Sequence, residues 1–167
     1  MDKKQLTQLL NHWLNDFLLR KFSSSHELIL VKSPETALSK LNDEVIKQIP
    51  NYSAWEFKPD VFAILKNKQT GKLELVLLNR STSALSLKEL GEMHCYARLT
   101  GAILSIVAST NGVSNEVNIL LLEDNIRQRI LKYSDSEPMI IIGWDEKNNR
   151  IREDSVIPFE KRDFILN

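Results

Sequence analysis

The chain has 167 residues, of which 43% are hydrophobic and 26% are charged, and both fractions are ordinary for a folded globular protein. Its 22 basic and 22 acidic residues give a formal net charge of zero. This balance argues against a strongly basic nucleic-acid coat protein but is compatible with a nucleic-acid enzyme that carries local charge. The single cysteine excludes an intramolecular disulfide and a cysteine-based zinc site.

Length and hydropathy predict one domain over residues 1–167. A chain of this size buries about two thirds of its unfolded surface and needs no covalent cross-link. Its first residues lack the apolar core of a signal peptide, and no stretch approaches the about 20 apolar residues that span a bilayer. We therefore expect a single cytoplasmic domain without membrane contact.

The first half of the chain predicts two helices, a strand and a hairpin. Apolar residues at helical spacing indicate a helix over 4–21, and the sequence HELILV indicates a buried strand over 26–31. A second helix is predicted over 36–48. Residues 54–65 predict a strand with an internal proline, which belongs at a strand start, an edge or a bulge. After a polar turn, residues 72–80 predict the returning strand of the hairpin.

The second half alternates helices and strands. A helix over 86–99 precedes a continuously apolar strand over 102–108, which is typical of a central strand. A long helix is predicted over 114–133, then a strand over 139–144 and a returning edge strand over 150–157. This order predicts an α/β fold with a mixed sheet flanked by helices. No Gly-rich loop follows any strand, which excludes a Rossmann or P-loop nucleotide site.

The chemically informative sequence lies within residues 58–109. The pair Pro59-Asp60 starts one strand, the hairpin returns through KLELVLLNR, a helix containing GEMHCYA follows, and the apolar strand AILSIVAS comes next. This order resembles the PD-(D/E)xK superfamily of nucleases. The resemblance implies a restriction-endonuclease-like mixed sheet flanked by helices. It also implies Mg²⁺- or Mn²⁺-dependent DNA cleavage in which the aspartate and a second acid bind the metal and a lysine activates water.

The hairpin register predicts which side chains meet Asp60. If Leu65 pairs with Leu73 across the turn, Asp60 lies opposite Leu78, and directly opposed Cβ atoms are about 4.5–5.5 Å apart. Arg80 then points to the same face two positions on. The tripeptide LNR therefore replaces the acid-x-Lys pattern of the family. Leu78 offers no oxygen to a hard cation, and Arg80 stays protonated, so it can hold a phosphate but cannot act as a base.

A helix motif offers a displaced acid. Glu92-x-x-x-Tyr96 resembles the Gln-x-x-x-Tyr motif of recombination-type nucleases in the same superfamily. Residues four apart share a helix face, so Glu92 is predicted to present its carboxylate toward Asp60 and Tyr96 to contact phosphate or support the site. Glu89 is a second candidate acid, although with Ser86 it also forms a capping-box pattern.

The remaining reactive and aromatic residues favour packing roles. His94 and Cys95 are adjacent on a helix and point to different faces, so they do not form a nucleophile–base pair. Cys95 is predicted to lie in the core and His94 at the surface or in a wall. Trp55 and Trp144 are expected to pack inside the fold, with stacking on bases as the other interpretation.

Two functions remain open. In the first, the protein is a metal-dependent DNA endonuclease of restriction or recombination type, in which Asp60 and Glu92 bind the metal and Arg80 and Tyr96 contact the substrate. In the second, it is a catalytically inactive nuclease-fold protein that acts as a DNA-binding or assembly subunit, with an Asp60–Arg80 ion pair holding the sheet together. DNA is the expected partner, with a homodimer or a partner subunit as the expected assembly. A small-molecule enzyme on another α/β fold has no motif in its favour.

Overall fold

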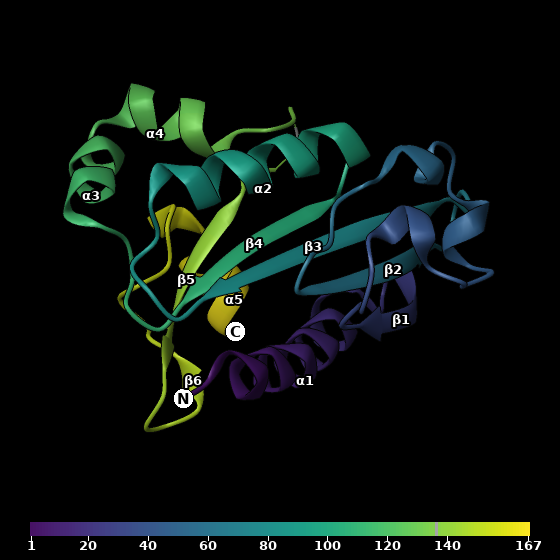
Figure 1. Cartoon of the computed structure of the whole chain (residues 1–167), viewed down its shortest axis with the longest axis horizontal. Helices are drawn as coiled ribbons and strands as arrows, with labels where there is room; N and C mark the ends of the chain where they lie inside the picture. Colours follow the sequence, from purple (N-terminus) through teal and green to yellow (C-terminus); the bar gives the residue numbers. More distant parts are fainter. Residues whose placement is uncertain (136) are drawn as a thin grey trace.

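A six-stranded mixed sheet with helices on both faces forms the centre of the molecule in the computed structural model, which describes residues 1–135 and 137–167 (Figure 1). The strand order is β1-β2-β3-β4-β5-β6. Strands β1 to β3 are antiparallel neighbours, β4 and β5 run parallel to β3, and β6 is antiparallel to β5. The strands are β1 (His26–Lys32), β2 (Val61–Asn67), β3 (Leu73–Ser81), β4 (Leu104–Ser109), β5 (Ile140–Asp145) and β6 (Arg150–Ile151). The predicted α/β class with a mixed sheet is confirmed.

The helices comprise five α-helices and four short 3₁₀ turns in the described part of the chain. The α-helices are α1 (Lys3–Phe22), α2 (Leu87–Thr100), α3 (Asn115–Leu122), α4 (Asp124–Leu131) and α5 (Arg162–Leu166). The 3₁₀ turns are η1 (Leu38–Lys40), η2 (Ile46–Gln48), η3 (Tyr52–Ala54) and η4 (Phe159–Lys161).

Helix α1 covers one face of the sheet together with α5 (Figure 1). The helix begins at Asp2, whose side chain accepts a hydrogen bond from the Gln5 N–H. Its apolar stripe meets alternate residues of the strands, because strand side chains alternate between the two faces. The buried residues of α1 are Leu6, Leu10, Leu14, Phe17 and Leu18. Among their partners from β2 and β3 are Val61, Ala63, Leu65, Val76 and Leu78.

Helix α2 lies on the opposite face, with α3 and α4 beyond it (Figure 1). The predicted capping box is confirmed: Ser86 is the N-cap, and the Glu89 carboxylate accepts from the Ser86 N–H at 2.8 Å. The helix ends at Gly101, whose φ of 63° is the left-handed conformation common after a helix C-terminus. Its buried residues are Leu90, Met93 and Ala97.

The helix predicted over 36–48 was wrong, since this segment forms only η1 and η2. The backbone N–H groups of Leu38 and Ser39 donate to the carbonyls of Phe57 and Trp55, at 3.0 and 2.9 Å. These donors therefore bond to a distant segment, which pulls the chain across the face of the sheet. The segment 55–60 is correspondingly outside the sheet, and β2 begins two residues after its proline.

The single helix predicted over 114–133 is divided into α3 and α4. Glu123 breaks it with an extended backbone, at φ −90° and ψ 122°. The Arg127 side chain donates to the Leu121 carbonyl at 3.0 Å, which satisfies an oxygen at the end of α3. The apolar pattern runs through both helices and gives no sign of this break.

The returning edge strand predicted over 150–157 is confirmed only at its start. β6 is two residues long, and an isolated bridge joins Ile157 to Ile141. Between these points the Arg152 N–H donates to the Gly143 carbonyl at 2.9 Å, but the Gly143 N–H donates to the Ser155 hydroxyl at 2.8 Å, so a side chain replaces one backbone hydrogen bond of the ladder.

Candidate functional site

Asp60 lies directly before β2, next to the carboxyl end of β3. The predicted register was wrong by one residue, because Leu65 pairs with Glu74 and Val61 pairs with Leu78. Asp60 therefore comes opposite Asn79, whose side-chain oxygen accepts its N–H at 3.0 Å.

The turn of the hairpin explains this shift. The Asn67 side chain accepts from the backbone N–H groups of Gln69 and Thr70, at 2.9 and 3.1 Å. Asn67 is therefore the first residue of the turn, one position later than the turn that the sequence suggested.

The structure brings Asp60 and Arg80 together in the ion pair that the second functional interpretation describes. Asp60 Oδ2 accepts from the Arg80 backbone N–H at 2.8 Å, and Oδ1 lies 3.4 Å from Nη1 of the guanidinium. Arg80 Nε also donates to Thr7 Oγ1 at 2.9 Å and to the Lys3 carbonyl at 3.2 Å. Both charged side chains are largely buried, with 26% and 19% of their surfaces exposed for Asp60 and Arg80. The guanidinium thus joins the end of β3 to the first turns of α1.

Leu78, which the sequence resemblance aligns with the second acid of the PD-(D/E)xK pattern, is fully buried beneath α1. A hard divalent cation takes six or more oxygen ligands, and here the neighbouring side chains are apolar. The Asp60 carboxylate is also already in contact with a permanent cation. In the described part of the chain, no three His, Cys, Asp or Glu side chains are grouped so that they could hold a metal. This donor set does not fit Mg²⁺ or Mn²⁺.

Glu92 and Tyr96 lie on α2, which covers the face opposite to α1. Glu92 is exposed, and no hydrogen bond or ion pair joins it to Asp60 among the described residues. The Tyr96 ring stacks on Phe57, with centroids 4.1 Å apart and an interplanar angle of 6°. Burial raises the pKa of Tyr96, and the Glu92 carboxylate adds to the shift. Tyr96 therefore supports the segment that leads into Asp60.

Of the adjacent residues His94 and Cys95, one lies where the sequence predicted and the other does not. Cys95 is exposed, so its predicted core position was wrong. His94 is the half-buried member of the pair, and its Nδ1 lies 2.8 Å from the Ile130 carbonyl because α4 packs on that side of α2. Trp55 and Trp144 are each 2% exposed, which confirms their packing role.

A cavity of about 290 Å³ beyond the carboxyl ends of β3, β4 and β5 was missed by the sequence analysis. Its wall includes the end of β5, and the side chain of Arg152 lies against Gly143 there. A glycine inside a strand indicates the close approach of another group, so Gly143 within MIIIGW was the available signal. The lining residues are Met1, Thr82, Thr110, Asn111, Trp144, Asp145, Glu146, Lys147 and Arg152.

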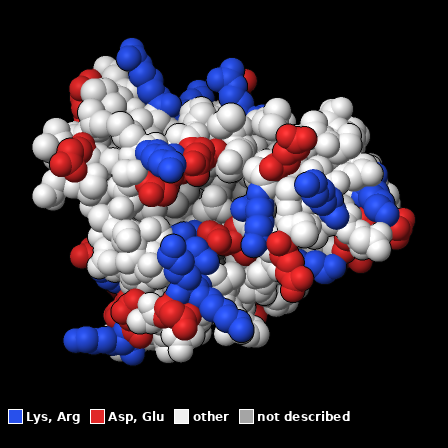
Figure 2. Space-filling view, in the orientation of Figure 1, with Lys and Arg blue, Asp and Glu red and all other residues white. Residues whose placement is uncertain are grey.

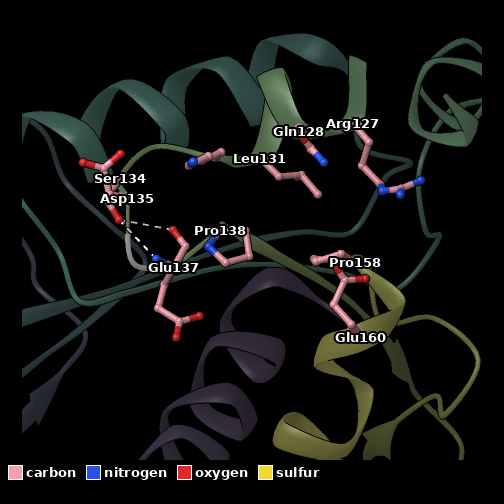
Figure 3. Close-up of a pocket in the computed structure, with 10 residues that line it drawn as sticks. Arg127, Gln128, Leu131, Ser134, Asp135, Glu137, Pro138, Pro158 and Glu160 are labelled. Atoms are coloured by element: carbon pink, nitrogen blue, oxygen red, sulfur yellow. Dashed lines mark hydrogen bonds between the residues drawn. The ribbon is translucent and has the colours of Figure 1, made fainter. Parts of the chain in front are cut away.

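A second cavity lies near the amino end of β5, away from Asp60. Figure 3 shows Arg127, Gln128 and Leu131 of α4 on one side and Pro158 and Glu160 on the other. Two of its charged side chains are paired: Arg127 contacts the Asp124 carboxylate at 2.5 Å, and Glu137 contacts Lys161 at 2.5 Å.

The surface and the comparisons add little that is specific to one function. Figure 2 shows basic and acidic side chains mixed across one face of the molecule rather than gathered in a single basic patch. None of the helices in the described residues has the length and apolar character needed to cross a membrane. No protein-family model matches the sequence, and no curated protein matches it.

Proposed function

We propose that this chain is a restriction-endonuclease-like protein without nuclease activity, acting as a DNA-binding or assembly subunit. The element order supports the family resemblance: a strand begins after Pro59-Asp60, the β2–β3 hairpin returns, and α2 leads to β4, which is parallel to β3. This is the order on which the resemblance rests.

One observation carries the non-catalytic interpretation. Both oxygens of Asp60 face Arg80, through the backbone N–H at 2.8 Å and the guanidinium at 3.4 Å. A metal at this carboxylate would have to displace or tolerate a permanent positive charge. The position of the second acid is occupied by the buried Leu78, which has no oxygen to offer. The same atoms that would bind metal therefore stabilise the contact between β2, β3 and α1.

A metal-dependent endonuclease with Glu92 as a displaced acid is the second candidate. One contact favours it, because the Tyr96–Phe57 stack places α2 against the segment that ends at Asp60. In that mechanism Asp60 and Glu92 would hold the ion, while Arg80 and Tyr96 would contact the phosphate of DNA.

A cleavage assay separates the two candidates. The purified protein is incubated with supercoiled, linear and branched DNA in Mg²⁺ and in Mn²⁺, beside the variants Asp60→Ala and Glu92→Ala. We expect no cleavage by any of the three proteins, while a gel-shift assay detects DNA binding or size-exclusion chromatography detects assembly. Metal-dependent cleavage that is lost in both variants would overturn the proposal and establish the endonuclease.

A further inference from the structure

The cavity at the carboxyl ends of β3, β4 and β5 contains a positioned guanidinium without an acidic partner. A Cβ atom on Gly143 would lie 2.6 Å from Nη2 and 2.8 Å from Nε of Arg152, so only glycine leaves room for this side chain against β5. Gly112 borders the same group from the other side, with its Cβ position 3.8 Å from Nη2. Arg152 is half-buried, so it is held in the wall of the cavity rather than extended into solvent.

Arg152 differs from three other arginines in its charge pairing. Arg80, Arg127 and Arg162 each contact a carboxylate within 4.0 Å. Within the described ranges 1–135 and 137–167, Arg152 forms no such ion pair, and its guanidinium donates no hydrogen bond. A guanidinium prefers a planar pair of anionic oxygens, which its fork of N–H groups binds in a bidentate manner.

Further donors surround this guanidinium. Thr82 and Thr110 line the cavity, and neither hydroxyl forms a hydrogen bond in the described part of the chain. Trp144, in the same wall, has a buried indole N–H that has no acceptor among those residues. Buried donors are nearly always satisfied in folded proteins, so an unsatisfied donor in this wall favours a ligand that brings an acceptor.

The two acids at the rim are already engaged within the chain. The Asp145 carboxylate accepts from the N–H of Lys147 at 2.9 Å and from the Asn148 side chain at 2.7 Å. Glu146 lies 3.6 Å from the amino group of Met1. Neither acid contacts Arg152, so the cavity presents Arg152 and the exposed Lys147 to an incoming ligand.

We propose that this cavity binds a phosphate group through Arg152, Thr82 and Thr110. The fork of Arg152 covers two oxygens, and a phosphate has further oxygens in other directions for the hydroxyls, whereas a carboxylate would have to use the same two oxygens for every donor. The position agrees with the general placement of ligands beyond the carboxyl ends of strands in open α/β sheets. That the phosphate belongs to DNA rests on the proposed function; the donor set itself would also accept a free phosphate or a nucleotide.

The test uses inorganic phosphate, a mononucleotide, and a DNA oligonucleotide with and without a 5′-phosphate. Affinities are measured by calorimetry for the full chain and for Arg152→Gln, with Arg150→Gln as the matched control. Arg150 is exposed on β6, two residues before Arg152, and does not line this cavity, so its loss changes the net charge equally without removing a lining group. We expect Arg152→Gln to weaken binding of at least one phosphate probe about tenfold or more, and Arg150→Gln to change it less than about twofold.

A second measurement guards against loss of folding in the variant. Titration of the wild-type protein with inorganic phosphate, followed by ¹H–¹⁵N NMR, should move the resonances of Thr110, Asn111 and the Arg152 side chain most, and Thr110→Val should weaken binding severalfold. Shifts centred elsewhere, or equal losses in Arg152→Gln and Arg150→Gln, would overturn the site.

The pattern among the probes identifies the source of the phosphate. Arg152-dependent binding of the oligonucleotide indicates DNA, and a preference for the 5′-phosphorylated form indicates a strand end. Dependence confined to phosphate or the mononucleotide indicates a small ligand. Because cleavage is measured separately, DNA cleavage that persists in Arg152→Gln would refute the non-catalytic function while leaving the phosphate site to be decided by binding alone.

Discussion

Two arginines lie at the carboxyl ends of strands of the same sheet, β3 and β5, and they differ in their charge pairing. Arg80, at the end of β3, contacts the Asp60 carboxylate, the Thr7 hydroxyl and the Lys3 carbonyl. Arg152, beside the end of β5, lies against Gly143 and has no acidic partner in the described part of the chain. The first guanidinium can hold an external phosphate only by giving up internal contacts, whereas the second can do so without loss. Capacity to bind a ligand at this edge thus follows from donors that are not already engaged within the chain, and the Arg80 guanidinium is already engaged.

Substitution of Leu78 by an acid is expected to have the largest effect, because it buries a charged group in the apolar core. Leu78→Glu places a carboxylate among fully buried apolar side chains, and the free energy of unfolding should fall by more than about 3 kcal/mol. Leu78→Met keeps the volume and should cost less than about 1.5 kcal/mol. Urea unfolding measures both. A stable Leu78→Glu protein that gains further stability from Mg²⁺ would show that Asp60 is able to bind metal after all.

Removal of the Asp60–Arg80 pair should lower the free energy of unfolding by less than Leu78→Glu does, but by a measurable amount. In Asp60→Ala the Arg80 backbone N–H and guanidinium lose their acceptor, and we expect a loss of about 1–3 kcal/mol. A double-mutant cycle with Arg80→Ala should give a coupling energy of about 0.5–3 kcal/mol. Asp154→Ala, which removes an exposed carboxylate without an ion pair among the described residues, serves as the control. A coupling energy near zero would mean that the pair is not structural.

Replacement of Gly143 should lower both the free energy of unfolding and the affinity of the cavity for phosphate. In Gly143→Ala the new methyl group would meet Arg152 Nη2 at 2.6 Å and Ser155 Cβ at 2.7 Å. We expect a loss of about 1–3 kcal/mol from overpacking, together with loss of phosphate binding because Arg152 is displaced. Gly91→Ala is the matched control, since nothing lies within 4 Å of its Cβ position and alanine favours a helix. Unchanged phosphate affinity in a folded Gly143→Ala protein would separate Arg152 from the site.

The elements whose signals are local were predictable from the sequence, and those that depend on distant contacts were not. The capping box of Ser86 and Glu89 and the helical end at Gly101 follow from short patterns and are confirmed. The segment 36–48 has helical periodicity, yet its backbone bonds to Trp55 and Phe57, which no local pattern reveals. Tertiary hydrogen bonds therefore override propensity where the chain crosses the sheet.

The same distinction between local and distant contacts applies to the candidate site. The meeting of Asp60 and Arg80 followed from the hairpin, even though the register differed by one residue, because both residues lie at the same end of the hairpin. The cavity at Arg152 depends on contacts between loops from three strands and on space left by Gly143. The residues of this site share no sequence spacing, so the strand glycine Gly143 is the one local signal that points to it.

The smallest expected effect concerns Asp145, the acid at the rim of the cavity. Its pKa lies below the ordinary value of 3.8, chiefly because the Asn148 side chain donates a hydrogen bond to the carboxylate. The carboxylate therefore stays charged through neutral and mildly acidic pH and repels a phosphate. Asp145→Asn should raise phosphate affinity by less than about fivefold, which is the size of one charge interaction near 4 Å in water.

The pH dependence of this effect distinguishes charge from geometry. Phosphate carries a single negative charge below about pH 5, so the ratio of the two affinities should be constant from about pH 5 to about pH 4. As the pH falls through the lowered pKa of Asp145, the wild-type carboxylate becomes neutral and the ratio should approach one. Calorimetric titrations of both proteins at several pH values measure it. A ratio above one that persists at low pH would instead mean that the substitution alters the turn between β5 and β6. The charge of Asp145 would then have no influence on phosphate binding, and the contrast between this cavity and the Asp60–Arg80 pair would depend on Arg152 alone.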